Sequence, residues 1–333
     1  MSTFRVTLKP SGHDYTVADD SNLLQAALDA GFVLPYGCRN GACGSCKATI
    51  IDGSVDHGAA QDTALPPHER AAGKVLLCSA HARSDLVIEC RELAGQAGIP
   101  VRTLPCRVQS LVRAAPDVMI VSLKLPVNER LQFLAGQYVE FLLKDGKRRA
   151  FSIANAPHDD EFLTLHIRHV PGGQFTEHVF STMKEKEILR ISGPLGSFFL
   201  REASARPIIL LAGGTGFAPI KSVIEHALHN GIDRPMTFYW GSRDRTGLYL
   251  PDLPPQWAAA HANLRYVPVL SDEAWDGRCG LVHRAVLEDC TDLSGFDVYA
   301  CGAPAMIDAA KADFAAAGLP DDAFFADSFT FAA

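Results

Sequence analysis

Four of the nine cysteines in this 333-residue chain have a spacing that restricts the fold more than any other feature. Cys38, Cys43 and Cys46 follow the pattern C-x4-C-x2-C, and Cys78 stands alone further along the chain. The odd total argues against a framework of disulfide bonds. The other five cysteines are scattered and read as small buried side chains, with Cys301 set apart by its neighbours. The first quarter of the chain must therefore wrap one loop around whatever these four thiols bind.

The spacing of these thiols is that of a plant-type [2Fe–2S] site. A loop that closes around an inorganic core needs unusual backbone dihedral angles, and the glycines beside the thiols can adopt them. Zinc also accepts four thiolates, but zinc ribbons usually offer two CxxC pairs, whereas here one loop supplies three ligands. The pattern therefore favours an iron–sulfur cluster, with these ligands: Cys38, Cys43, Cys46 and Cys78.

Charge and hydropathy argue against several classes of function. The chain has 31 Lys and Arg against 38 Asp and Glu, a net charge of −7, whereas nucleic acids and anionic membranes attract basic proteins. The longest apolar run, over 207–219, contains three glycines and is too short to cross a bilayer. The N-terminus alternates polar and apolar residues, like a strand, and lacks the pattern of a signal peptide. We therefore expect a cytoplasmic protein that binds neither nucleic acid nor membrane.

The middle of the chain indicates a small antiparallel barrel of short alternating strands separated by turns, at 107–112, 118–125, 137–143 and 162–169. Arg149 and Phe151 are two residues apart on an extended segment, so their side chains point to one face. That face can hold a phosphate on the arginine and a planar ring on the phenylalanine, with the Ser152 hydroxyl near the ring edge.

A second pattern follows in the same segment. Gly173-Gln174-Phe175-Thr176 precedes an expected helix over 177–183, and free amides at such a terminus, with the Thr176 hydroxyl, attract a pyrophosphate. Each pattern alone is weak and compatible with an ordinary surface strand, but their order along the chain favours a flavin site. His166, His169 and His178 are interpreted as core or surface residues rather than metal ligands.

The last third predicts an open parallel α/β sheet. An apolar run ends in Gly213-Gly214-Thr215-Gly216 and is followed by a helical pattern over 221–229, which is typical of a buried strand, a tight turn and a crossover helix. Further strands are expected at 236–240, 264–270 and 297–301. Ligands of such sheets lie at the carboxyl ends of the strands, where Ser242, Arg243, Cys301 and Gly302 are found.

The whole chain resembles a known family. Residues 1–92 are similar to plant-type ferredoxin domains. Arg149-Ala150-Phe151-Ser152 and the stretch 173–176 resemble the RxYS and GxxS/T motifs of the ferredoxin–NADP reductase superfamily. The stretches 213–219, 241–243 and 301–306 resemble its GGTGxAP, GSR and CGxPxM motifs. Within that superfamily the chain resembles reductases of the CDP-6-deoxy-Δ3,4-glucoseen type and of ring-hydroxylating dioxygenases such as the terephthalate system.

This resemblance implies a multidomain α+β and α/β protein. A β-grasp ferredoxin domain is expected over 1–92 and a linker over 93–103. A six-stranded antiparallel β-barrel that binds FAD is expected over 104–203, and a parallel α/β domain that binds NAD(P) over 204–333.

The resemblance also assigns roles to single residues. Ser152, Thr215 and Cys301 are expected to meet where hydride is transferred. The other expected cofactor contacts are Arg149, Phe151, Ile167, Gly173, Gln174, Phe175, Thr176, Gly214, Gly216, Ser242, Arg243, Gly302 and Phe329. Phe151 replaces the usual tyrosine, which keeps the stacking surface but loses a hydroxyl.

The coenzyme is not decided by these residues. Arg243 suits a 2′-phosphate and Asp244 repels one, so NADH and NADPH both stay open, with an inclination to NADH. The aromatic run 324–331 either covers the flavin or forms a packing strand.

Together the three segments imply a reductase component. Electrons would pass from NAD(P)H to FAD, then to the [2Fe–2S] cluster, and then to a partner oxygenase or a CDP-deoxysugar dehydrase. Phenol or methane monooxygenase reductases differ only in that partner. The alternative from another class is a redox-sensing or carrier module that binds the nucleotide without steady turnover.

Overall fold

A computed structural model of the chain describes residues 2–93 and 99–330, which form two compact units. The first unit holds the N-terminal residues up to Ile99 together with Gly196–Phe198, and the second holds Pro100–Leu195 and the chain from Phe199 onward. Residues 94–98 of the expected linker, and Phe331 of the aromatic run, lie outside the described residues. No helix in the described ranges is both long and apolar enough to cross a membrane.

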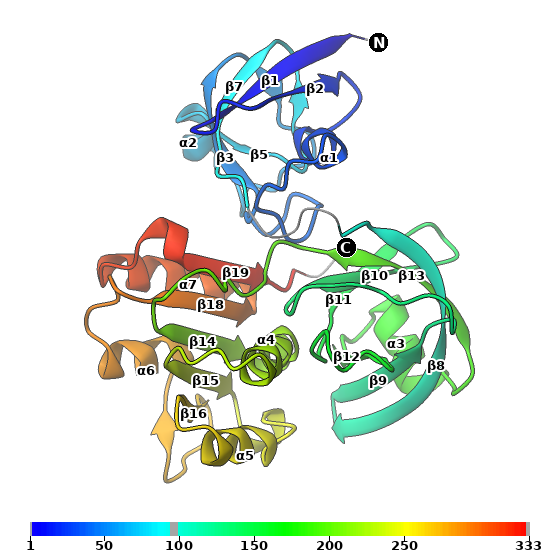
Figure 1. Ribbon diagram of the computed structural model, residues 1–333, viewed down its shortest axis with the longest axis vertical. Helices are drawn as coiled ribbons and strands as arrows, with labels where there is room; N and C mark the ends of the chain where they lie inside the picture. The colour runs from blue at the N-terminus through cyan, green and yellow to red at the C-terminus, as the bar shows by residue number, and fades with distance from the viewer. Residues whose placement is uncertain (1, 94–98, 331–333) are drawn as a thin grey trace. The chain divides into compact units, whose positions relative to one another are not determined.

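The N-terminal unit is built on a mixed sheet with the strand order β2-β1-β7-β3-β5 (Figure 1). Strands β1 and β7 run parallel and the other neighbours run antiparallel. Helix α1 starts where the Asn22 side chain accepts the N–H of Gln25, and its apolar face is buried in the core. Strands β1 and β2 form an antiparallel hairpin, and α1 follows it. The elements are β1 (Thr3–Lys9), β2 (Asp14–Ala18), α1 (Leu23–Asp29), β3 (Lys47–Asp52), β4 (Val55–Asp56), α2 (Pro67–Ala71), β5 (Lys74–Leu76), β6 (His81–Ala82) and β7 (Leu86–Glu89).

The second unit begins with a six-stranded antiparallel sheet of order β11-β10-β13-β8-β9-β12. In the described part of the chain its outer strands meet at one isolated bridge, between Ile153 and Leu165, so no continuous ladder closes the sheet. Its elements are β8 (Arg102–Ala115), β9 (Val118–Lys124), β10 (Tyr138–Leu142), β11 (Arg148–Ser152), β12 (Leu163–Arg168), α3 (Gln174–Ser181) and β13 (Ile188–Leu195). The helix expected over 177–183 begins earlier, because Gly173 is extended and takes the N-cap position.

The rest of the second unit is a six-stranded parallel sheet of order β17-β16-β15-β14-β18-β19 (Figure 1). Helix α4 begins four residues before the expected start, because Pro219 fits within a first helical turn. The elements are β14 (Ile208–Gly213), η1 (Gly214–Gly216), α4 (Phe217–His229), β15 (Met236–Ser242), η2 (Arg245–Gly247), α5 (Leu253–Ala260), β16 (Leu264–Leu270), β17 (Arg278–Cys279), α6 (Val282–Asp289), β18 (Asp297–Gly302), α7 (Pro304–Ala316), η3 (Asp321–Ala323) and β19 (Phe324–Ser328).

Both faces of the parallel sheet are covered, which explains its nearly continuous apolar strands. On β15, Phe238 and Trp240 stack with Phe217 of α4, at ring-centroid distances of 5.6 and 4.0 Å. The intervening Tyr239 points to the opposite face, where it joins a core cluster with apolar side chains of α6 and α7. The two helix layers therefore fix the carboxyl ends of the strands at one edge of the sheet.

The amino-terminal edge of the parallel sheet is held by a buried ion pair. Arg234 and Asp297 are 8% and 3% exposed, and the guanidinium donates to the carboxylate at 2.6 Å. The same guanidinium donates to the carbonyls of Arg201 and Arg206, so each of its three nitrogens has an acceptor. Such a pair stabilises the fold only while both partners are present.

Replacing Arg234 by Met should lower the free energy of unfolding of this part by roughly 3–5 kcal/mol, because the buried carboxylate loses its close partner and keeps only Arg206, whose Nη1 lies 3.8 Å away. All three tryptophans lie between residues 240 and 275, so the intrinsic fluorescence during urea unfolding reports on this sheet. Arg284→Met is the control, because Arg284 is 61% exposed and its pair with Asp313 should contribute less than about 1 kcal/mol. Equal losses in the two variants would contradict the prediction.

Candidate functional site

The four predicted cluster ligands form two pairs of thiols in the N-terminal unit. The Cys38 and Cys43 side chains interact directly with each other, and so do those of Cys46 and Cys78. Within the first pair each sulfur also accepts the partner's backbone N–H, at 3.3 and 3.4 Å. The contact with Cys43 lowers the pKa of Cys38 to about 6. The loop that carries Cys38, Cys43 and Cys46 turns through Gly41 and Gly44, which have φ of 77° and 75°.

Two pairs of thiols suit a two-iron cluster better than a single zinc ion. A [2Fe–2S] centre takes two protein ligands on each iron, whereas a structural zinc site draws four ligands around one point. Among the described residues, no three or more Cys, His, Asp or Glu side chains converge to hold one metal ion. The donor set therefore fits the cluster that the spacing predicts, and the backbone N–H groups directed at sulfur fit it as well.

In the second unit, strand β11 presents the predicted flavin residues. Phe151 is part of an aromatic cluster with Phe175 of α3 and Phe141 of β10, at centroid distances of 5.5 and 5.9 Å. Arg149, two residues earlier on the same face, is half-buried, and its guanidinium donates to the carbonyl of Arg148. Phe141, which lies opposite Arg149 in the β10–β11 register, was not predicted.

The stretch 173–176 differs from expectation in one respect. Thr176 lies inside the first turn of α3, and its hydroxyl is already hydrogen-bonded to the backbone of Val170, at 3.0 Å from the oxygen and 3.1 Å from the nitrogen. A side chain at Gly173 would come within 2.7 Å of this hydroxyl, so the turn needs a glycine. The anion-binding groups that remain are the backbone amides of the first turn of α3. Ile167 is fully buried in the core of the antiparallel sheet.

The turn Gly214–Gly216 lies directly against strand β18. A Cβ atom at Gly216 would be 2.0 Å from the carbonyl oxygen of Cys301, so no other residue fits this position. The carbonyl of Gly214 accepts the indole N–H of Trp240 at 3.0 Å, and Thr215 is buried between these contacts. Cys301 is completely buried, and Gly302, next to it, accepts the backbone N–H of Phe329.

Ser152 and Cys301 come together through an aspartate that the sequence interpretation missed. The Ser152 hydroxyl donates to Asp327 at 3.4 Å, and Asp327 pairs with Cys301 in the parallel ladder of β18 and β19. Burial and the Asp327 carboxylate raise the pKa of the Cys301 thiol well above its usual value. The only sequence signal for Asp327 is its place near the end of the aromatic run, which the structure shows to be strand β19 over Phe324–Ser328.

The end of β15 carries the other expected nucleotide residues. Ser242 lies against Gly247, and Arg243 is exposed. Hydrogen bonds from Thr246 and from the Gly247 backbone lower the pKa of Asp244, so this carboxylate is ionised at neutral pH. A negative charge next to Arg243 disfavours a ligand with an additional phosphate.

Arg168, at the end of β12, was also missed. Its guanidinium covers Gly214, where a Cβ atom would be 3.1 Å from Nη2. Nε and Nη2 are buried and make no hydrogen bond, although Nε lies 3.5 Å from an Asp117 carboxylate oxygen. Unsatisfied cationic donors over a glycine turn fit an anionic ligand such as a dinucleotide.

His166 is a core residue, as interpreted. Its Nδ1 is 2.8 Å from the hydroxyl of Tyr249, and this contact links the antiparallel and parallel parts of the unit. Burial, and then the charge of Lys221, lowers the pKa of His166 to about 3. The imidazole is therefore neutral in the folded protein at any ordinary pH.

The depressed pKa of His166 should make the second unit less stable in acid. Between pH 6.5 and 3 the unfolded chain binds a proton here and the folded one does not, so stability falls by about 2 kcal/mol from pH 7.5 to pH 5. His166→Gln should reduce this loss, as measured by urea unfolding followed by tryptophan fluorescence at both pH values. His178→Gln, a change at a more exposed ring, should leave it unchanged. An unaltered pH slope in His166→Gln would contradict the assignment.

Burial and the raised pKa should make Cys301 inert to alkylation. Iodoacetamide reacts with thiolates, so at pH 8 it should modify the exposed Cys279 and leave Cys301 unmodified, as read from peptide masses. Modification of Cys301 as fast as that of Cys279 would show that this strand end opens to solvent.

Comparison with known proteins agrees with this arrangement. The chain matches three family models: a 2Fe-2S iron-sulfur cluster binding domain over residues 6–83, an oxidoreductase FAD-binding domain over 105–200, and an oxidoreductase NAD-binding domain over 210–312. These matches confirm the expected cofactors.

Several relatives align with nearly the whole chain. CDP-6-deoxy-L-threo-D-glycero-4-hexulose-3-dehydrase reductase from Yersinia pseudotuberculosis is 43% identical over 329 residues, which cover 98% of each chain. Reductase component 2 of terephthalate 1,2-dioxygenase from Comamonas sp. is 37% identical over 318 residues, covering 95% of this chain and 94% of the relative. The crystal structure of the Amycolatopsis cytochrome P450 reductase GcoB matches with a TM-score of 0.81 and 34% identity, over 98% of each chain. The chain therefore belongs to the family of flavin and iron–sulfur reductase components, oxidoreductases that carry electrons from NAD(P)H through FAD to a [2Fe–2S] cluster.

Proposed function

We propose that this protein is an NADH-oxidising reductase that delivers electrons one at a time to a separate oxygenase or CDP-sugar dehydrase. The hydrogen bond between Ser152 and Asp327 carries the proposal, because it joins the end of the flavin strand to the strand ends around Cys301. The names of the relatives, one reductase of a dehydrase and one of a dioxygenase, support a partner of one of these two classes. Unpaired thiols suit a cytoplasmic location.

The proposed domains follow the expected bounds, 1–92, 104–203 and 204–333, with a linker over 93–103. The matched ranges, 6–83, 105–200 and 210–312, fall within them. We propose that the six-stranded antiparallel sheet is a barrel, which the bridge between Ile153 and Leu165 supports, and that the N-terminal sheet has the β-grasp arrangement.

FAD would be held by the antiparallel part. Arg149 and the first turn of α3, over 173–176, would bind its phosphates, and Phe151 would contact its ring. When bound, the flavin accepts two electrons as hydride and releases them singly, which neither a nicotinamide nor a one-electron cluster can do alone. The neutral thiol of Cys301 and the Ser152 hydroxyl would supply uncharged, hydrogen-bonding surroundings where the hydride passes.

The nicotinamide nucleotide would lie on the turn 214–216, beneath Arg168 and beside Gly302 and Phe329. Ser242 and Arg243 would contact its adenosine end, and the ionised Asp244 favours NADH over NADPH. Each NADH gives up a hydride and becomes NAD⁺. Cys38, Cys43, Cys46 and Cys78 would hold the cluster, which would supply a one-electron path for these electrons, and one proton would be released.

Anaerobic stopped-flow mixing with NADH should bleach the flavin absorption first and the cluster absorption afterwards, with a slower response to NADPH. In Cys78→Ser the flavin should still be reduced, while the cluster signal disappears and reduction of cytochrome c, a one-electron acceptor, falls at least tenfold. Cys90→Ser, a change at a buried thiol outside the two pairs, should behave like the parent protein. If neither nucleotide bleaches the flavin, a sensing or carrier module is the better description.

A further inference from the structure

We propose that Ser222 and Lys221 are positioning residues for hydride transfer. They fasten helix α4 to the segment 154–159, which follows the flavin strand β11. This proposal rests on the proposed function and adds the device that sets the separation between the two reacting partners.

The two hydrogen bonds connect segments that lie next in sequence to Ser152 and Thr215, two residues proposed to lie where hydride is transferred. Ser152 ends β11, and the segment 154–159 begins two residues later. Thr215 lies in the turn that precedes α4, and Lys221 and Ser222 stand in the second turn of that helix. Fixing α4 to this segment therefore fixes the nucleotide turn relative to the flavin strand.

Two hydrogen bonds make the connection. The Ser222 side chain is completely buried, and its hydroxyl donates to the carbonyl of Asn155 at 2.8 Å. The ammonium of Lys221 donates to the carbonyl of Ala154 at 3.2 Å and pairs with Glu225 at 2.6 Å. A serine inside a helix usually bonds back to its own helix, so a hydroxyl that bonds to another segment is a specific contact.

The segment that receives these bonds is itself held in place. Asn155 is 3% exposed, and its side chain donates to the carbonyl of Asp159 and accepts the N–H of Thr164 at the start of β12. On the other side, the apolar face of α4 is buried against its own sheet. The segment 154–159 is therefore fixed to the antiparallel sheet, and helix α4 is fixed to the parallel sheet.

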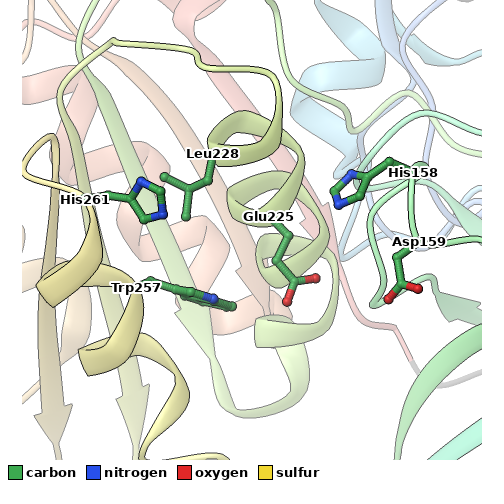
Figure 2. A pocket seen from close by; sticks show the side chains of 6 residues that line it. All are labelled: His158, Asp159, Glu225, Leu228, Trp257 and His261. Carbon is green, nitrogen blue, oxygen red and sulfur yellow. The ribbon is translucent and has the colours of Figure 1, made fainter.

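Beside these two bonds the junction is polar and borders a pocket. His158 of the segment stacks on His229, at the end of α4, with ring centroids 3.6 Å apart. Figure 2 shows His158 and Asp159 on one side of Glu225, with Trp257 and His261 on the other, around a pocket of about 520 Å³. Buried contacts of His166 with Phe217 and Tyr249 also cross between the two parts, but around this pocket the two directed bonds are what hold α4 to the segment.

Hydride transfer is sensitive to such orientation. A misplacement of about 1 Å, even when caused by a residue remote from the chemistry, can lower a rate by about 10²-fold. The nucleotide itself contacts neither Ser222 nor Lys221 in the proposed site. Loss of these bonds should therefore slow the transfer step and leave nucleotide affinity almost unchanged.

The test uses the full holoprotein and two substitutions, Ser222→Ala and Lys221→Met. In each, the limiting rate of flavin reduction by saturating NADH should fall about tenfold, and the isotope effect with NADH deuterated at the transferred position should rise. Affinity for ADP-ribose, measured by calorimetry, should stay within about twofold. Lys221→Arg, which keeps a donor, should restore most of the rate.

Ser181→Ala is the matched control, because this helical serine bonds only to a carbonyl of its own helix and should leave the rate unchanged. Flavin and cluster absorption verify that each variant retains its cofactors, and Lys221→Met carries the test if Ser222→Ala does not fold. Unchanged rates and isotope effects in the variants, or a loss confined to ADP-ribose affinity, would overturn the positioning role. Failure of NADH to reduce the parent protein would instead refute the proposed function.

Discussion

The candidate site depends on one contact between two stretches of backbone. Gly216 lies so close to the carbonyl of Cys301 that not even a methyl group fits between them. This contact places the glycine turn over the end of β18, and β18 in turn sets the position of its parallel neighbour β19, which carries Asp327. Asp327 accepts a hydrogen bond from Ser152 in the antiparallel part. The placement of Cys301, Asp327 and Ser152 therefore depends on residue 216 being a glycine.

The N-terminal unit solves a different problem, which is how to offer four thiols to two metal ions. Its sheet and helix α1 form a conventional core, and the cluster loop extends from that core between α1 and β3. The loop changes direction at glycines, and its N–H groups point at sulfur. The pairing of the thiols distinguishes this loop from a zinc knuckle. The spacing of the cysteines alone only favoured an iron–sulfur cluster over a zinc site.

Much of the fold and the cofactor set could be predicted because local patterns determine them. Alternating strands, the apolar strand before Gly213 and the thiol spacing are all properties of neighbouring residues. Asp327, Arg168 and Ser222 could not be found in this way, since each acts on a residue far away in the chain. The predicted start of α3 was wrong for a related reason. Thr176 was expected to offer a free hydroxyl before the helix, but it lies in the first turn and its hydroxyl bonds to Val170.

The amino-terminal and carboxyl-terminal ends of the parallel strands have separate roles, one in stability and one in binding. Arg234 and Asp297 hold the amino-terminal edge, and the exposed Arg243 stands at the opposite edge, where the nucleotide is expected. Substitution of the exposed Arg243 side chain should therefore do little damage to folding. Such a division leaves coenzyme preference free to drift during evolution, and it gives an engineer a place to retarget the enzyme without first reinforcing the scaffold.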